Sequence, residues 1–153
     1  MATDSKICAF MTQKGGAGKS VLTNILPNEI ILWHLLHSGK QVNVLVVDID
    51  PQQTNTAKRK RDIEQLSYKE TSPEFLAMDL GQKTEIGQFQ RRYALLIDAG
   101  FKTYKMQYVD LGNDTQISRA LENIQSREYD YVFIDFPGTL TQDGTGAFLQ
   151  LVQ

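Results

Sequence analysis

Lys14-Gly15-Gly16-Ala17-Gly18-Lys19-Ser20 is the stretch of the chain that says most about its fold. It follows an apolar run, Ile7–Met11, and leads into a segment with helical spacing of apolar residues, Gly18–Ser38. Glycines let the backbone fold around phosphate oxygens, and the first amides of a following helix add further donors. In this context we expect Lys19 to reach the β- and γ-phosphates of a nucleotide and the Ser20 hydroxyl to bind Mg²⁺. The motif therefore predicts a phosphate-binding loop between a strand and a helix.

The rest of the chain alternates between apolar runs and helix-like segments. We expect strands at Ile7–Met11, Val42–Val47, Tyr104–Leu111 and Tyr131–Phe136, and helices at Gly18–Ser38, Thr54–Leu66, Ile86–Ala99 and Thr115–Gln125. Apolar runs without polar alternation are typical of strands buried on both faces of a parallel sheet. The alternation predicts an α/β fold with a mainly parallel sheet. Together with the phosphate-binding motif, it indicates a three-layer, Rossmann-like P-loop NTPase. Pro27 is expected to kink or interrupt the first helix.

Composition bounds the class of protein. The chain has 153 residues, a formal net charge of −2 and ordinary proportions of apolar and charged residues, which favours one globular domain. This charge gives no sign of a nucleic-acid or membrane-surface binder. A single cysteine, Cys8, excludes a disulfide framework and a four-cysteine metal site, and we expect it to be a core residue. No targeting segment is recognised in Met1–Lys6, so we expect a cytoplasmic protein.

The loop departs from the ordinary P-loop in a way that points to a family. Position 13 is glutamine instead of glycine, and Lys14 adds a second lysine at the start of the loop. With this deviant Walker A box the sequence resembles the ParA/MinD superfamily of P-loop ATPases. Two further motifs follow in the family's order, a strand ending in Asp-x-Asp-Pro-Gln at Val46–Gln52 and a Walker B strand at Tyr129–Gly138. The resemblance covers the chain from Lys6 to about Gly146.

The resemblance implies a role for individual residues. Lys14 corresponds to a signature lysine that crosses a dimer interface to the partner's phosphates, as an arginine finger does. Asp50 corresponds to the aspartate that orients the attacking water, whereas Asp48 and Asp135 correspond to carboxylates that hold Mg²⁺ through its waters. The expected catalytic residues are Lys14, Lys19 and Asp50; the expected metal-binding residues are Ser20, Asp48 and Asp135; and the expected nucleotide-binding residues are Gly15, Gly16, Ala17, Gly18, Lys19, Ser20, Val21 and Gly138.

Some of these positions have plainer interpretations or depart from the family pattern. An aspartate at the end of a strand often serves only as a cap or turn former. Val21 stands where the family commonly has a second hydroxyl residue, and Gln53 stands where a glycine is common. Gly138 belongs to an Asp-x-x-Gly pattern whose glycine amide could sense the γ-phosphate, and that pattern alone is weak.

The resemblance implies an Mg²⁺-dependent ATPase that forms a homodimer on binding ATP and acts on DNA or a DNA-bound partner protein. The setting would be DNA partition or conjugative-transposon transfer, because residues 135–139 are also similar to the TraA-type branch. Two alternatives stay open, a truncated nucleotide-binding module without turnover and a related small-molecule ligase or kinase. Since sheets of this class usually have more than four strands, we expect residues 1–153 to be the N-terminal part of a longer domain. No membrane anchor is expected in Thr145–Gln153.

Three weaker features have simple structural explanations. The basic run Lys58–Arg61 could contact DNA or an acidic partner, but we favour a solvated helix face balanced by Asp62 and Glu64. His34 and His37 are expected to be ordinary surface or packing residues. Trp33 is expected to pack in the core or between helix and sheet.

Overall fold

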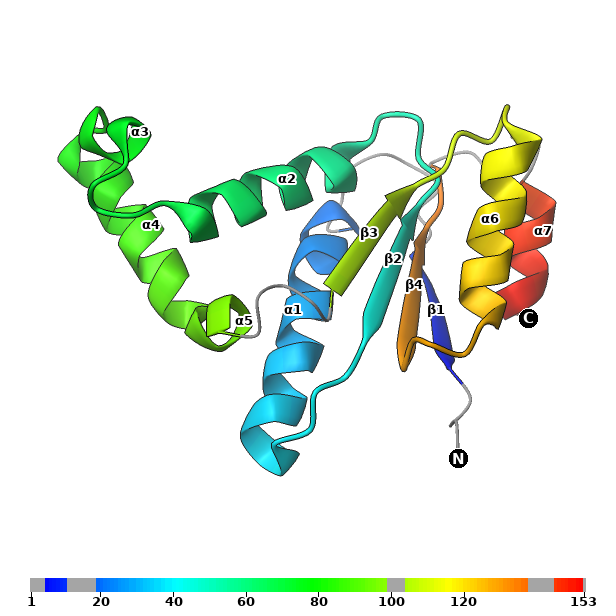
Figure 1. Cartoon of the computed structure of the whole chain (residues 1–153). Coiled ribbons are helices and arrows are strands. Elements are labelled where there is room, and N and C mark those ends of the chain that lie inside the picture. The colour runs from blue at the N-terminus through cyan, green and yellow to red at the C-terminus, as the bar shows by residue number, and fades with distance from the viewer. Residues whose placement is uncertain (1–4, 11–18, 99–103, 138–144, 153) are drawn as a thin grey trace.

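A parallel sheet of four strands, in the order β1–β4–β2–β3, forms the centre of the computed structural model (Figure 1). The structure describes residues 5–10, 19–98, 104–137 and 145–152. The strands are β1 (Lys6–Phe10), β2 (Val44–Asp48), β3 (Tyr104–Tyr108) and β4 (Tyr131–Asp135). All three strand pairs are parallel, as the alternation of strands and helices predicts.

Helices cover both faces of the sheet, so the described fold has three layers (Figure 1). One face packs against α1 (Lys19–Ser38), α2 (Thr54–Ser67) and α5 (Ala94–Asp98). The other packs against α6 (Asp114–Gln125), α7 (Thr145–Leu149) and a short 3₁₀ helix (Gln150–Val152). Successive residues of β2 alternate between the two cores, with Val44 and Val46 facing α1, and Leu45 and Val47 facing α6. The prediction that this strand is buried on both faces is therefore confirmed.

The edge strand β1 is less buried than predicted. In β1 the side chains of Ile7, Ala9 and Phe10 are only partly buried, and Cys8 is exposed. The expectation that Cys8 is a core residue is wrong. The reason is topological, because within the described residues β1 pairs only with β4 and so lies at an edge.

Helix α1 runs through Pro27 without interruption, so the expectation that this proline interrupts the first helix was wrong. Pro27 is buried, and the same helix packs Ile31 and Leu32 on the sheet. This packing offsets the one backbone hydrogen bond that proline cannot donate. Trp33 is not in the core, since 54% of its surface is exposed. None of the helices in the described ranges is long and apolar enough to cross a bilayer.

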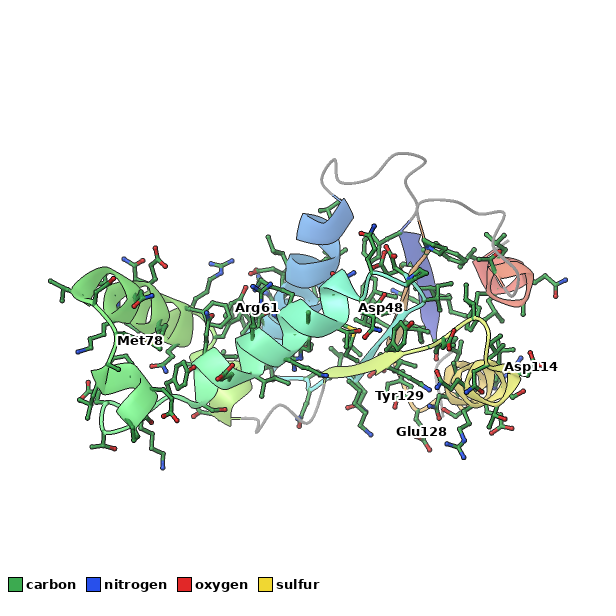
Figure 2. All side chains as sticks on the ribbon, turned by 90° about the horizontal axis from the view of Figure 1, so that it is seen from above. Asp48, Arg61, Met78, Asp114, Glu128 and Tyr129 are labelled. Atoms are coloured by element: carbon green, nitrogen blue, oxygen red, sulfur yellow. The ribbon has the colours of Figure 1, made fainter. Side chains whose placement is uncertain are left out.

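The segment between α2 and β3 folds differently from the expected helix at Ile86–Ala99. It contains α3 (Pro73–Leu76) and α4 (Leu80–Arg92), followed after Tyr93 by α5. Helix α4 begins at Leu80 because Asp79 and Gln82 form a reciprocal capping box, with the Asp79 carboxylate accepting from the Gln82 N–H at 2.8 Å. Helices α2 to α4 form an arm that extends beyond the sheet (Figures 1 and 2).

We predict that Asp79→Ala lowers the free energy of unfolding by about 1 kcal/mol, because the first turn of α4 loses its capping acceptor. Urea unfolding measures the change, and Asp79→Asn should restore most of it. Glu85→Ala, an exposed change inside the same helix, is the control and should have little effect. Equal losses in the two alanine variants would show that the cap does not define this helix.

Candidate functional site

The carboxyl ends of the strands meet at one edge of the sheet, and two aspartates lie next to each other there. Asp48 ends β2, Asp135 ends β4, and the two are Cα partners in the ladder between these strands. Both are buried, with 0% and 2% of their surface exposed. Phe10, the last residue of β1, is the Cα partner of Asp135, so β1 ends at this edge too. Figure 2 looks down on the edge and labels Asp48.

The Asp48 carboxylate accepts three hydrogen bonds. Its Oδ1 accepts the backbone N–H of Asp50 at 3.1 Å, and its Oδ2 accepts both the N–H (3.2 Å) and the hydroxyl (2.7 Å) of Thr56. Asp48 thus forms a turn and caps α2, which is the plainer role of an aspartate at a strand end. Burial raises the pKa of Asp48 above its ordinary value, although the hydrogen bonds from Thr56 and Asp50 oppose the rise. A nearby cation would favour the ionised form.

The carboxylate of Asp135 is also bound by α2, through Asn55. The Asn55 side-chain amide donates to Asp135 Oδ2, and Asn55 has no exposed surface. Asn55 and Thr56 are adjacent in the first turn of α2, so this single turn binds carboxylates from two adjacent strands. The sequence analysis missed both residues, because it treated Thr54–Leu66 only as a charged helix. Their position directly after the Asp-x-Asp-Pro-Gln motif, at the start of a helix, was the available signal.

Asp50 lies in the turn that joins β2 to α2 and is half-buried. Its Oδ1 accepts the Gln52 N–H, and its carbonyl oxygen accepts the Gln53 N–H, both at 3.0 Å. Gln53 then adopts φ 54° and ψ 29°, the left-handed conformation that favours glycine. The position where the family commonly has glycine therefore has a glycine-like backbone, although a longer side chain occupies it.

The predicted phosphate-binding residues are only partly described. Lys19, Ser20 and Val21 form the start of α1, and Figure 1 places that end of the helix near the carboxyl edge of the sheet. Lys14 to Gly18 and Gly138 lie outside the described residues. The structure thus brings Asp48, Asp50 and Asp135 to the edge where α1 begins. In the described ranges no three histidine, cysteine or acidic residues form a group able to hold a metal ion by themselves.

The weaker sequence features lie elsewhere. In the basic run, Lys58 forms an ion pair with Asp62 and Arg59 is buried, so only Lys60 and Arg61 fit the expected solvated face. His34 Nε2 lies 2.9 Å from the Tyr131 hydroxyl, and His37 Nδ1 lies 2.9 Å from the Trp33 carbonyl oxygen. Both histidines are therefore engaged in hydrogen bonds, His34 with β4 and His37 within its own helix.

Comparison with known proteins gives two findings. Residues 5–147 match a family model described as an AAA domain. A solved structure titled "Crystal Structure of ParA Family ATPase from Chlorobium tepidum TLS" aligns with 15% sequence identity and a TM-score of 0.42. That alignment covers 95% of this chain and 57% of the other, so the chain spans little more than half the length of that protein.

We predict that Gln53→Gly raises the free energy of unfolding by about 0.5–1 kcal/mol, because glycine adopts the left-handed conformation without steric cost. Chemical unfolding measures the gain. Gln52→Gly is the matched control, since its neighbour Gln53 has the positive φ and Gln52 does not. Gln52→Gly should slightly lower the free energy of unfolding. The same change in the free energy of unfolding for both variants would show that the backbone of Gln53 is not strained.

Proposed function

We propose, since the chain belongs to the ParA/MinD-like family of AAA-domain P-loop ATPases, that it is a nucleotide-dependent dimerisation switch. ATP binding would join two copies, and hydrolysis would release them. The observation that supports this most is the pair of buried aspartates, Asp48 and Asp135, at the sheet edge where β1 ends and α1 begins. Negative charge is buried there only at a cost, which a bound cation would offset.

The residues at this edge fit a magnesium ion. Mg²⁺ prefers oxygen ligands and keeps several of its waters, and two carboxylates at the same register position of adjacent strands suit such a hydrated ion. Each carboxylate oxygen can accept about two hydrogen bonds. Asp48 Oδ2 already accepts two, whereas Oδ1 accepts one from Asp50 and retains capacity. We propose that Ser20, Asp48 and Asp135 hold the ion, which when bound would neutralise phosphate charge.

The nucleotide phosphates would lie at the start of α1. Backbone amides at a helix N-terminus bind anions, and the glycines before it allow close approach. We assign this role to Gly15, Gly16, Ala17, Gly18, Lys19, Ser20, Val21 and Gly138. Lys19 would contact the phosphates of its own protomer, and Lys14 those of its partner. Adenine as the base rests on family membership.

Asp50 is the proposed water-orienting residue. It is half-buried at the same edge, and the Gln52 N–H fixes one of its oxygens. A carboxylate in this position could accept a hydrogen bond from a water that attacks the γ-phosphorus, while the bond to the β–γ bridging oxygen breaks. On the same premise we propose a cytoplasmic role in DNA partition or in mobile-element transfer of the TraA type, acting on DNA or a DNA-bound protein.

Sedimentation velocity with Mg²⁺ and either ATP or ADP tests the switch. We expect a dimer with ATP and a monomer with ADP. In Asp50→Ala the ATP-dependent dimer should outlast that of the unchanged protein, because hydrolysis should slow by about a hundredfold when water is no longer oriented. A monomer in every condition, with ATP still bound, would contradict the switch and favour a nucleotide-binding module without turnover.

Two lysine variants separate binding from association in the same experiment. Lys19→Ala should lose nucleotide affinity by about two orders of magnitude, because a direct phosphate contact disappears. Lys14→Ala should bind ATP normally but remain monomeric. A Lys14→Ala protein that still dimerises would show that this lysine does not act across an interface.

We further predict that Asn55→Ala lowers the free energy of unfolding by about 1–3 kcal/mol, because buried Asp135 loses a donor. It should also change the Mg²⁺ concentration needed for half-maximal ATP binding. Asn123→Ala is the control, since this exposed residue also donates from its amide, to Gln107 at 2.9 Å. Unchanged stability and Mg²⁺ dependence in Asn55→Ala would refute a positioning role.

A further inference from the structure

A groove lies between α1 and the junction of α4 with α5, away from the aspartate pair. Its volume is about 440 Å³, and its walls include Trp33 and Leu36 from α1, Arg91 and Arg92 from α4, and Leu95 from α5. We propose that this groove, called here the Trp33 groove, binds an amphipathic helix of a partner protein that presents apolar side chains flanked by acidic ones.

The apolar residues of the Trp33 groove are unusually exposed. The exposed fractions are 54% for Trp33, 70% for Leu36 and 40% for Leu95. Trp33 and Leu36 are three positions apart on α1, so they share one helix face, and Ile25 extends that face as another exposed apolar residue. Exposed apolar residues that gather on one surface mark interaction sites, and tryptophan and arginine dominate binding energy at such sites.

The charges beside these residues favour an acidic partner. The groove contains two arginines and one glutamate, Glu29. Arg92 Nη2 lies 2.5 Å from Glu29 Oε1, and the Tyr93 hydroxyl is a further donor to the same oxygen at 3.5 Å. Glu29 is thus neutralised by neighbours within the chain. Arg91 is exposed and forms no ion pair with a described residue, which leaves the groove with a net positive charge.

Shape and charge together favour an acidic helix of a partner protein over a second copy of the chain or a membrane surface. A second copy that docked by the same groove across a two-fold axis would place arginines against arginines, which costs binding energy. A membrane surface is nearly flat and would contact protruding residues, whereas a groove between two helical walls fits a third helix with anchors at i, i+3 and i+7. A comparable groove between α2 and α4 has two basic and two acidic side chains in its lining, so its charge selects no partner.

Intrinsic fluorescence gives a direct test, because Trp33 is the only tryptophan in the sequence. Two helical peptides of about 16 residues would carry the same leucines at i, i+3 and i+7, with glutamates beside them in one and lysines in the other. We expect a saturable blue shift of Trp33 emission with the glutamate peptide and about tenfold weaker binding of the lysine peptide, a difference typical of charge complementarity.

Matched variants locate the binding site. Arg91→Glu should weaken the glutamate peptide and strengthen the lysine peptide, and Leu36→Ser should weaken both. Leu76→Ser, a change at another exposed leucine on α3 outside the groove, should alter neither. Circular dichroism would establish that each variant is folded.

Four outcomes would overturn the proposal. The first three are no saturable shift with the glutamate peptide, equal affinity for the two peptides, and a shift that appears only with vesicles of phosphatidylcholine and phosphatidylglycerol. The fourth is a shift that depends on protein concentration without peptide, together with dimers in sedimentation equilibrium, which would assign the groove to a second copy instead. None of these readouts requires ATP. The result for the Trp33 groove is therefore independent of whether the dimerisation switch is correct.

Discussion

The first turn of α2 holds two carboxylates in a place where burial disfavours them. Thr56 binds Asp48, and Asn55 binds Asp135, so neighbouring residues of one helix connect to neighbouring strands of the sheet. Desolvation raises the pKa of Asp48, and without these donors the charged form would be costlier still. The arrangement of α2 against β2 and β4 therefore depends on satisfying these polar groups as well as on apolar packing.

The central strands make this arrangement possible. Every residue of β2 is buried, and its alternate side chains pack into two different cores. A strand fixed on both faces cannot slip by one residue without moving its apolar side chains to the wrong layer. The register that places Asp48 opposite Asp135 is thus set by Val44 to Val47 and their partners on β4. The aspartates of the site are in this sense part of the core rather than of a surface loop.

The central strands of the sheet could be predicted from the sequence better than the burial of the edge strand β1 and of the exposed face of α1. The apolar run before Asp48 identified β2, because full burial on both faces leaves a clear pattern. Cys8 was placed wrongly, since the same pattern does not reveal which strand will lie at an edge. The expectation that Trp33 packs in the core or between helix and sheet was wrong for a related reason. Helix periodicity identifies an apolar face but does not show what covers that face. Asn55 escaped notice because its partner, Asp135, is eighty residues away along the chain.

The arm of α2 to α4 has a mechanical consequence. Helix α2 has 14 residues and is attached at its first turn to the aspartate pair, so its far end lies about 20 Å from that attachment at 1.5 Å per residue. A helix of this kind is a stiff rod, and a rotation of about 10° at the attached end displaces the far end by about 3–4 Å. Because Leu66, one residue before that far end, is buried in the core beside α1 and α5, a rearrangement of hydrogen bonds around Asp48 and Asp135 would displace α3 and α4 only if this apolar packing shifted as well.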